Sequence, residues 1–282
     1  MERLGVIGKP SDWLIASKVN YQDVKDLFDI ELIDIDINEL ISLANSSTSL
    51  ALNQEFENLN YNKNELKKAY AIYVALLKIV EKYQLKGLTV RCFDLLNTLH
   101  STSCLAFAFL NRDNIIATCE GDIPSLITMY LINKITNKPS FQANPAKINL
   151  KDNEIIFAHC TLPFSMCESF TLTTHFESKI GVAIKGKLKN SKVSILKFNS
   201  DFTKFVFLKG TIIKNLNSNK LCRTQILIKI DNQYDLNYFL TKPLGNHHII
   251  VYEDIESKLL TYLRQNKKCK ILEILGFKGV FR

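Results

Sequence analysis

The sequence is poor in the glycine motifs that mark many nucleotide-binding enzymes and hydrolases. It has only 10 glycines among 282 residues. No Walker-type loop and no Gly-x-Gly-x-x-Gly motif follows its first apolar segment. A Gly-x-Ser-x-Gly motif is also absent, which argues against the nucleophile elbow of serine hydrolases. Any chemistry must therefore come from other residue types.

Long apolar runs and paired cysteines are missing as well. The longest apolar stretch, near 104–110, is far too short to cross a bilayer. The apolar run at the N-terminus stops at Gly8-Lys9-Pro10 and does not resemble a signal peptide. Seven cysteines are scattered without a Cys-x-x-Cys pair, as is usual for reduced thiols. We therefore expect a cytoplasmic protein without a membrane partner.

The charge balance is moderately basic, with a net charge of +8 from 36 basic and 28 acidic residues. Basic residues are dispersed, apart from a cluster at Lys267, Lys268 and Lys270. A solvated helix end explains this cluster more simply than a nucleic-acid contact does. The single tryptophan and the lack of a helix-turn-helix pattern give no further support. We expect no nucleic-acid partner.

The first 140 residues alternate strand and helix signals. Apolar segments predict strands at 4–7, 30–37, 87–92 and 115–119, and helical patterns at 11–28, 62–83 and 123–136. Ser11 or Asp12 is the expected cap of the first helix. Strands that alternate with helices favour a doubly wound parallel sheet.

The pattern changes near residue 140, where Pro139 and Pro145 bracket a predicted connection. Beyond it, short β-rich runs separated by polar turns favour an antiparallel barrel or sandwich. The runs lie at 154–159, 170–174, 181–184, 193–198, 205–208 and 225–230, with short helices near 236–240 and 253–265. We expect a Rossmann-like α/β domain over 1–140 and a mostly antiparallel β domain over 141–282.

Polar residues gather at the expected carboxyl ends of the parallel strands, where open α/β sheets bind ligands. Lys9 to Trp13 follow the first strand, Arg91 and Asp94 bracket the end of the third, and Glu120 follows the fourth. A carboxylate in the position of Glu120 suits a general base or a metal ligand. A helix start with Asp122 as the capping acid is the simpler alternative.

Asn246-His247-His248 offers imidazole nitrogens to a divalent metal that takes mixed oxygen and nitrogen ligands. Neighbouring residues in a strand face opposite sides, so one histidine can face a site while the other packs. Two structural histidines at a strand end are the alternative. His159 ends another β-rich run. A nucleophile at Cys160 is not favoured, because its side chain would face away from His159.

Two segments resemble the L-fucose isomerase family, which shares its fold with L-arabinose isomerase. The run 119–129, Cys-Glu-Gly-Asp-Ile-Pro-Ser-Leu-Ile-Thr-Met, is similar to the family segment whose glutamate binds Mn²⁺ and acts as acid and base. Gly245-Asn246-His247 resembles the family's Asn-His segment. The resemblance implies metal binding by Glu120 and His247, and His159 matches a further histidine of the arabinose-type relatives. It covers the chain well from about residue 85 onward.

The chain departs from the family pattern in two ways. The family's second acidic ligand follows Phe-Ala, whereas Phe141-Gln142-Ala143-Asn144 stands here, so Asn144 would ligate through an uncharged amide. Asp122 or Asp94 is expected to compensate, and we count Asn144 and Asp122 with Glu120 in the catalytic set. The chain also resembles a short form of the family without its first N-terminal domain.

The implied activity is aldose–ketose isomerisation of a free sugar through an enediolate, with Mn²⁺ or another divalent cation as Lewis acid. Arg91, Asp94, Trp13 and Asn246 are the expected substrate-binding residues. A non-catalytic protein that binds a sugar or metabolite is the alternative.

The resemblance also implies how the site is assembled. Glu120, Asn144 and His247 should meet in one cleft, despite their separation in the sequence. We expect a homo-oligomer, a trimer or a hexamer, whose neighbouring subunit covers that cleft.

Overall fold

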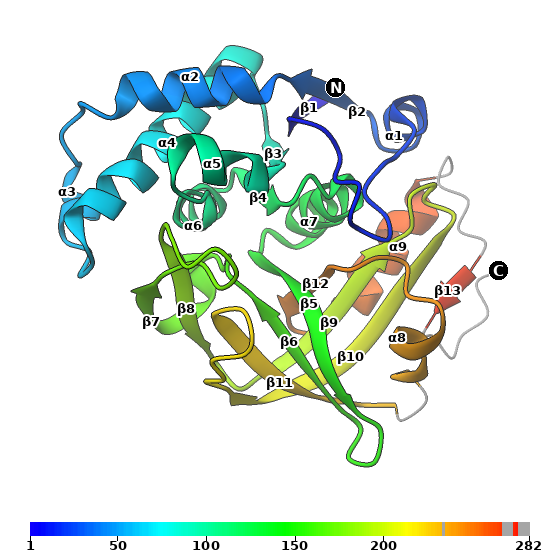
Figure 1. Cartoon of the computed structure of the whole chain (residues 1–282). Helices are drawn as coiled ribbons and strands as arrows, with labels where there is room; N and C mark the ends of the chain where they lie inside the picture. Colours follow the sequence, from blue (N-terminus) through cyan, green and yellow to red (C-terminus); the bar gives the residue numbers. More distant parts are fainter. Residues whose placement is uncertain (233–234, 267–272, 276–282) are drawn as a thin grey trace.

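A four-stranded parallel sheet organises the first half of the chain (Figure 1). The computed structural model describes residues 1–232, 235–266 and 273–275, the last of these as backbone only. The strand order is β2-β1-β3-β4, with bounds β1 Glu2–Ile7, β2 Ile30–Ile35, β3 Gly87–Val90 and β4 Ile116–Cys119. The helices between these strands are α1 Tyr21–Phe28, α2 Ile37–Ser47, α3 Gln54–Glu57, α4 Lys63–Tyr83, the 3₁₀ turn η1 Cys92–Asp94, α5 Leu95–Leu99 and α6 Cys104–Arg112. Helix α7 Ile123–Thr136 follows β4.

Helices cover both faces of this sheet, because its strands bury side chains on both sides. Leu4 and Val6 of β1 pack in the apolar cluster that includes α1 and α7. Ile7 packs in the opposite cluster, with α2, α4 and α6. The predicted doubly wound parallel sheet is confirmed.

Helix α1 begins at Tyr21, and the prediction of a helix from Ser11 is wrong. Asn20 caps α1 by accepting two backbone N–H groups of its first turn. Ser11 does not cap a helix, because its hydroxyl donates to the backbone carbonyl of Glu120. Residues 9–20 therefore form an irregular loop at the carboxyl edge of the sheet.

The second half forms a closed antiparallel barrel, as predicted. Six strands follow the order β11-β6-β5-β12-β9-β10, and β10 pairs back to β11. Their bounds are β5 Ser140–Asn149, β6 Glu154–His159, β9 Lys192–Phe198, β10 Lys204–Asn215, β11 Thr224–Ile230 and β12 His248–Tyr252. Outside the closed barrel lie the hairpin β7 Cys167–Thr173 and β8 Ala183–Leu188, strand β13 Glu273–Leu275, the 3₁₀ turn η2 Phe164–Met166, and helices α8 Asn237–Thr241 and α9 Glu256–Gln265.

Strand β5 runs through the segment that was predicted to be a connection. Pro145 misled the prediction, because proline is uncommon inside a sheet. The structure places it at an irregularity in the β5–β6 pairing, between Pro145 and Lys147, and β12 pairs with β5 only as far as Ala143. Bulges of this kind tolerate proline. Helices α2, α3 and α6 were also not predicted.

Helix α7 joins the sheet to the barrel. Its side chains Leu126 and Ile127 share an apolar cluster with Leu196 of β9 and Ile249 of β12. Phe107 of α6 likewise belongs to a cluster that reaches the barrel strands. The architecture changes between α7 and β5, near residue 140. Because the two parts share their cores, the division into two domains stays a prediction.

The expectation of mostly buried, unpaired thiols fits the described cysteines. Six are free, and four of these are buried. Cys269 and the lysine cluster at 267, 268 and 270 lie outside the described residues. Among the described helices, none combines the length and the apolar character that a membrane crossing requires.

Side-chain amides complete the outer edge of β4. Asn111 donates to the carbonyl of Ala117 (2.8 Å) and accepts from its N–H (3.0 Å). Gln142 of β5 accepts from the N–H of Cys119 (2.8 Å) and donates to its carbonyl (3.2 Å). Buried backbone groups need such partners, and the two amides supply them where a fifth strand would. The Gln142 pair also fixes the peptide directly before Glu120.

Replacing Gln142 tests how much this edge contributes to stability. In Gln142→Leu, a buried N–H and a buried carbonyl of Cys119 lose their partners. We expect the free energy of unfolding to fall by about 1–3 kcal/mol for each group left unpaired. Urea denaturation measures the change. Gln22→Leu, an exposed change on α1, should stay within about 0.5 kcal/mol of the parent. Equal effects of the two substitutions would contradict the role given to Gln142.

Candidate functional site

Glu120 lies at the corner between β4 and α7, in a strained turn. Glu120 and Gly121 both adopt left-handed backbone, with φ of 64° and 60°. A Cβ on Gly121 would lie 2.7 Å from the carbonyl oxygen of Lys9, so only glycine fits there. For glutamate this conformation costs on the order of 1 kcal/mol, and it persists only where the surroundings impose it. Here the Ser11 hydroxyl holds the Glu120 carbonyl.

Two histidines of the barrel lie against the Glu120 carboxylate. His247 Nε2 is 3.4 Å from Glu120 Oε1, and His159 Nε2 is 3.6 Å from the same oxygen. The two imidazole rings meet edge to face, with centroids 5.1 Å apart. Both histidines are buried, and the Glu120 side chain is 14% exposed. The fold thus brings the carboxylate of the sheet and the imidazoles of the barrel together.

Asp122 stands behind His247 and is itself paired with a buried lysine. Asp122 Oδ2 is 2.9 Å from His247 Nδ1. Lys197 Nζ of β9 lies 2.9 Å from both carboxylate oxygens of Asp122 and 2.8 Å from Ser125 Oγ. Asp122 also caps α7 by accepting from the Ser125 N–H. The capping alternative is therefore correct for Asp122. It does not apply to Glu120, and the result is a chain of charges from Lys197 to Glu120.

These charges control one another's protonation. Burial alone would raise the pKa of Glu120, but the adjacent His247 and His159 outweigh it and hold that pKa below its usual range. Burial alone would lower the pKa of His247, but Glu120 and Asp122 raise it to about 9. Burial lowers the pKa of His159. In this arrangement His247 is an imidazolium at neutral pH and His159 is neutral.

The donor set fits a divalent metal ion. His247 Nε2 is a buried polar nitrogen without a hydrogen-bond partner in the described part of the chain. One atom each of Cys119, Glu120 and His159 lie within 4.8 Å of one another. Cys119 Sγ lies 2.8 Å from Cys92 Sγ in a buried pair of thiols, and sulfur is a softer donor than oxygen or nitrogen. Glu120, His159 and His247 offer the oxygen and nitrogen atoms that suit a divalent cation of mixed preference.

Asn144 lies on β5, between the two segments that carry the histidines. It pairs with Ala158, the residue before His159, while its neighbour Ala143 pairs with His248. Along β5, Asn144 is therefore paired with the residue next to His159, and it directly follows the residue that pairs with His248. Its side chain forms no hydrogen bond with another described residue. Whether it binds a metal stays a prediction.

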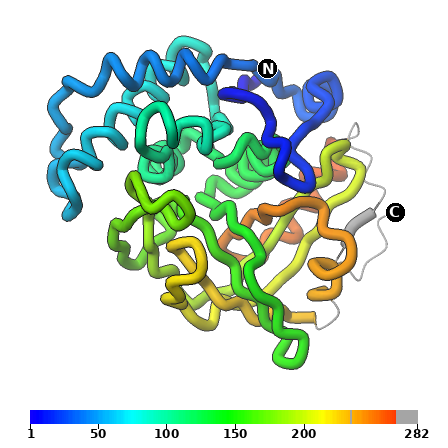
Figure 2. The backbone as a smooth tube through the Cα atoms, in the orientation of Figure 1, coloured from blue at the N-terminus to red at the C-terminus, as the bar shows by residue number. Residues whose placement is uncertain are grey.

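The loop of residues 9–17 lies over the site. Trp13 Nε1 donates to Glu120 Oε2 at 3.0 Å. The Ile15 N–H donates to Asn246 Oδ1 at 2.6 Å, which joins the loop to the segment before His247. Figure 2 shows this contact as the dark blue loop beside the orange segment. Asn246 therefore anchors the loop with the same amide that was predicted to bind substrate.

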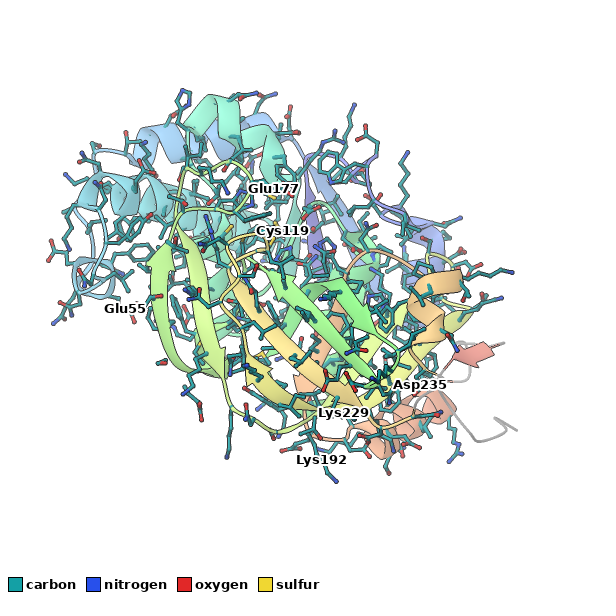
Figure 3. All side chains as sticks on the ribbon, turned by 60° about the horizontal axis from the view of Figure 1, so that its bottom comes forward. Glu55, Cys119, Glu177, Lys192, Lys229 and Asp235 are labelled. Atoms are coloured by element: carbon teal, nitrogen blue, oxygen red, sulfur yellow. The ribbon has the colours of Figure 1, made fainter. Side chains whose placement is uncertain are left out.

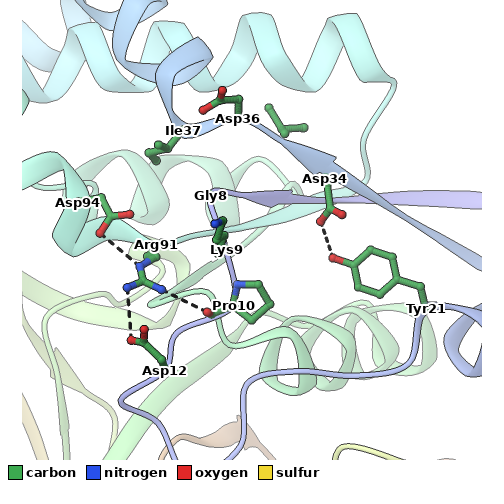
Figure 4. Close-up of a pocket in the computed structure, with 11 residues that line it drawn as sticks. Gly8, Lys9, Pro10, Asp12, Tyr21, Asp34, Asp36, Ile37, Arg91 and Asp94 are labelled. Atoms are coloured by element: carbon green, nitrogen blue, oxygen red, sulfur yellow. Dashed lines mark hydrogen bonds and ion pairs between the residues drawn. The ribbon is translucent and has the colours of Figure 1, made fainter.

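Arg91 and Asp94 lie beside the site, on the rim of a neighbouring cavity. The Arg91 guanidinium stacks on the Trp13 ring at 4.6 Å and pairs with Asp12 and Asp94, each at 3.3 Å. Arg91, Asp12 and Asp94, together with the ends of β1 and β2, line a cavity of about 760 Å³ (Figure 4). Trp13 links the two places, because its ring contacts Arg91 and its N–H binds Glu120.

The loop that follows β7 packs against the aromatic residues beside the site. His175 contacts Phe93 edge to face at 5.9 Å, and Phe93 contacts Trp13 at 5.5 Å. Glu177 lies on the same loop, and burial together with the charge of Glu120 raises its pKa. Figure 3 shows Glu177 and Cys119 at the end of the barrel that meets the parallel sheet.

The sequence predictions missed three residues that shape this site. Lys197, Gln142 and Cys119 were assigned no role, although each contacts or adjoins a predicted site residue. A signal existed for Lys197, because it is the one charged side chain in the otherwise apolar and small run 193–198. A lysine in a buried strand needs a carboxylate partner.

Comparisons with known proteins give a limited likeness. The chain matches no protein-family model. It is 23% identical over 279 residues to a protein of Priestia megaterium named sulfoquinovose isomerase, a match that covers 92% of this chain and 61% of the relative. Proteins with the same name in Clostridium sp. and Alkalicoccus urumqiensis are 23% and 20% identical, over 83% and 69% of this chain and 56% and 47% of the relatives. The chain thus spans about six-tenths or less of the curated relatives it matches.

The pH dependence of the unfolding free energy tests whether His175 is buried as a neutral ring in the loop after β7. Its Nδ1 accepts from the Ser178 N–H at 3.3 Å, and burial lowers its pKa to about 4. Since the unfolded chain binds this proton near pH 6.5, stability is present above 6.5 and is lost as pH falls toward 4. We expect His175→Gln to flatten the fall in unfolding free energy over this window by roughly 1 kcal/mol per pH unit. Urea denaturation at pH 7, 6, 5 and 4.5 measures it, and an unchanged slope would contradict the burial of a neutral ring.

Proposed function

We propose that the protein is an aldose–ketose isomerase that works with a divalent metal ion. The observation that carries the proposal is the buried Nε2 of His247, which has no hydrogen-bond partner in the described part of the chain and faces Glu120 beside His159. The similarity to proteins named sulfoquinovose isomerase supports sugar isomerisation as the reaction. Their name makes sulfoquinovose the first substrate to test. The resemblance to the fucose and arabinose isomerases adds L-fucose and L-arabinose.

Glu120, His159 and His247 would hold the ion, and Asn144 would add an amide oxygen. When bound, an ion such as Mn²⁺ polarises the sugar carbonyl and stabilises the negative charge that develops on the neighbouring oxygens. Asp122 accepts the His247 Nδ1–H and leaves Nε2 directed at the site. This arrangement of carboxylate, imidazole and metal is common in metal centres.

Glu120 would transfer the proton between C2 and C1 of the open-chain sugar. Its carboxylate is ionised, because the histidines hold its pKa low, and Trp13 binds one of its two oxygens. A general base is most effective when its pKa lies near neutrality. A pKa below that range makes Glu120 a weak base, so the acidity of the substrate C–H has to lower the barrier. Burial keeps bulk water from the transferred proton.

A non-catalytic sugar-binding protein is the second candidate. Asn144 favours it, because this residue replaces the charged ligand expected from the resemblance. The carboxylate of Glu120 beside two buried imidazoles opposes it, because this set suits a metal ion and a base for proton transfer. Assembly into a homo-oligomer stays an expectation, and the 42% exposure of Trp13 above the site leaves a surface that a neighbouring subunit could cover.

Substitution of Glu120 separates the two candidates. With Mn²⁺ present, the wild type should interconvert an aldose and its ketose, with sulfoquinovose, glucose, L-fucose and L-arabinose as the first panel. Glu120→Gln keeps the shape but removes the base, so turnover should fall by roughly 10²–10⁴-fold. Proton NMR in D₂O follows both the products and deuterium uptake at carbon. Glu168→Gln, an exposed change on β7, is the matched control. Calorimetric sugar binding without turnover of any panel sugar would favour the binding protein.

Trp13 offers a direct readout of metal binding. It is the only tryptophan in the chain, and its N–H binds Glu120, so Mn²⁺ should change its emission. Asn144→Asp adds a charged ligand and should tighten Mn²⁺ binding, with a larger metal-dependent rise in melting temperature. Asn45→Asp on the exposed face of α2 is the control. Unchanged or weaker binding in Asn144→Asp would remove Asn144 from the ligand set.

A further inference from the structure

We infer that Lys197 is a positioning residue of the metal centre, which holds Asp122 so that Asp122 keeps the His247 ring turned toward Glu120. The inference rests on the proposed metal site. Lys197 touches no ligand of that site itself. It acts through one carboxylate, that of Asp122.

The surroundings of Lys197 are fully specified. Its side chain is wholly buried, and its ammonium nitrogen lies within 2.9 Å of Asp122 Oδ1, Asp122 Oδ2 and Ser125 Oγ. An ammonium has three N–H donors, so these three acceptors satisfy it. The lysine therefore has one task in the structure, which is to neutralise and orient Asp122.

Stability alone does not explain this buried pair. Replacing a buried ion pair by apolar residues of similar volume is often neutral or stabilising, because both ions lose their hydration. The other side-chain partner of Asp122 is His247, at 2.9 Å. A metal-binding histidine usually donates its second N–H to a carboxylate, and that carboxylate sets the ring orientation. The Lys197–Asp122 pair therefore orients the His247 ring.

Lys197 holds the carboxylate that contacts His247 from the side opposite Glu120. Both carboxylates contact this ring, Asp122 at Nδ1 and Glu120 at Nε2. The Lys197 ammonium binds both oxygens of Asp122, so the carboxylate is held with Oδ2 at 2.9 Å from His247 Nδ1. Without the lysine, Asp122 would lose both hydrogen bonds from β9, and no group of that strand would fix its orientation toward the ring.

Gly245 makes room for this arrangement. A Cβ at residue 245 would lie 2.7 Å from Cε of Lys197 and 3.3 Å from its Nζ. The chain therefore passes directly over the lysine, two residues before His247. This accounts for the whole motif Gly245-Asn246-His247: the glycine accommodates Lys197, the asparagine holds the loop, and the histidine faces Glu120.

The test is a Mn²⁺ titration of the wild type and Lys197→Met, read by Trp13 emission and by the electron spin resonance of free Mn²⁺. We expect Lys197→Met to bind Mn²⁺ roughly 10–100-fold more weakly. Lys192→Met makes the same change at the exposed start of β9, at the far end of the barrel from Cys119 (Figure 3), and should bind like the wild type. Urea denaturation of each variant measures its stability in parallel.

Two further variants separate positioning from folding. Asp122→Asn combined with Lys197→Met removes both charges and should recover stability relative to Lys197→Met, because Asn also caps α7. It should not recover Mn²⁺ affinity. Gly245→Ala keeps every charge but displaces the ammonium, and should weaken Mn²⁺ binding in a folded protein. Recovery of affinity together with stability in the double variant would overturn the inference, as would wild-type affinity in folded Lys197→Met.

Sugar turnover is measured separately, so the two proposals can fail separately. Mn²⁺ binding that depends on Lys197 in a protein without sugar turnover would end the isomerase proposal and leave the positioning role in place. Sugar turnover together with unchanged Mn²⁺ affinity in Lys197→Met would support the isomerase proposal and end the positioning role of Lys197. A wild type that binds no Mn²⁺ would overturn the inference about Lys197.

Discussion

The buried carboxylate of Asp122 is the group on which this site depends. It is wholly buried, so the protein must supply its partners: the Ser125 N–H from α7, the Lys197 ammonium from β9 and the His247 imidazole from the segment before β12. These partners come from the helix that follows the parallel sheet and from two parts of the barrel. One charge therefore adds a specific polar contact to the apolar clusters that join the two halves, and Glu120 and the histidines lie beside it.

Much of the fold could be predicted where the signal is local. The bounds of α7 and β6 agree with the sequence pattern, because apolar periodicity and the flanking polar residues mark both ends. The pattern failed where distant contacts took over. Ser11 has the chemistry of a helix cap, yet its hydroxyl binds Glu120 across the site. Pro145 indicates a loop, yet a bulge accommodates it within β5.

The candidate site shows the same division. Glu120 could be singled out because it directly follows an apolar strand, and His247 because it lies in a short polar motif that resembles a known family. Lys197 and Gln142 could not be assigned, because their partners Asp122 and Cys119 are far away in the sequence. A buried lysine indicates that an acid lies nearby, but only the fold shows which one. Asp122 both caps α7 and contacts His247, and this double role likewise depends on residues that are far apart in the sequence.

The amides of Asn111 and Gln142 have a consequence for how copies of this chain can associate. An exposed edge strand invites another strand to add to it, and proteins protect themselves by covering such edges. At β4 the outward backbone groups of Ala117 and Cys119 are already bonded to these two side chains. A second molecule therefore cannot extend the parallel sheet there without displacing them. The predicted assembly of copies would therefore use surfaces other than this edge.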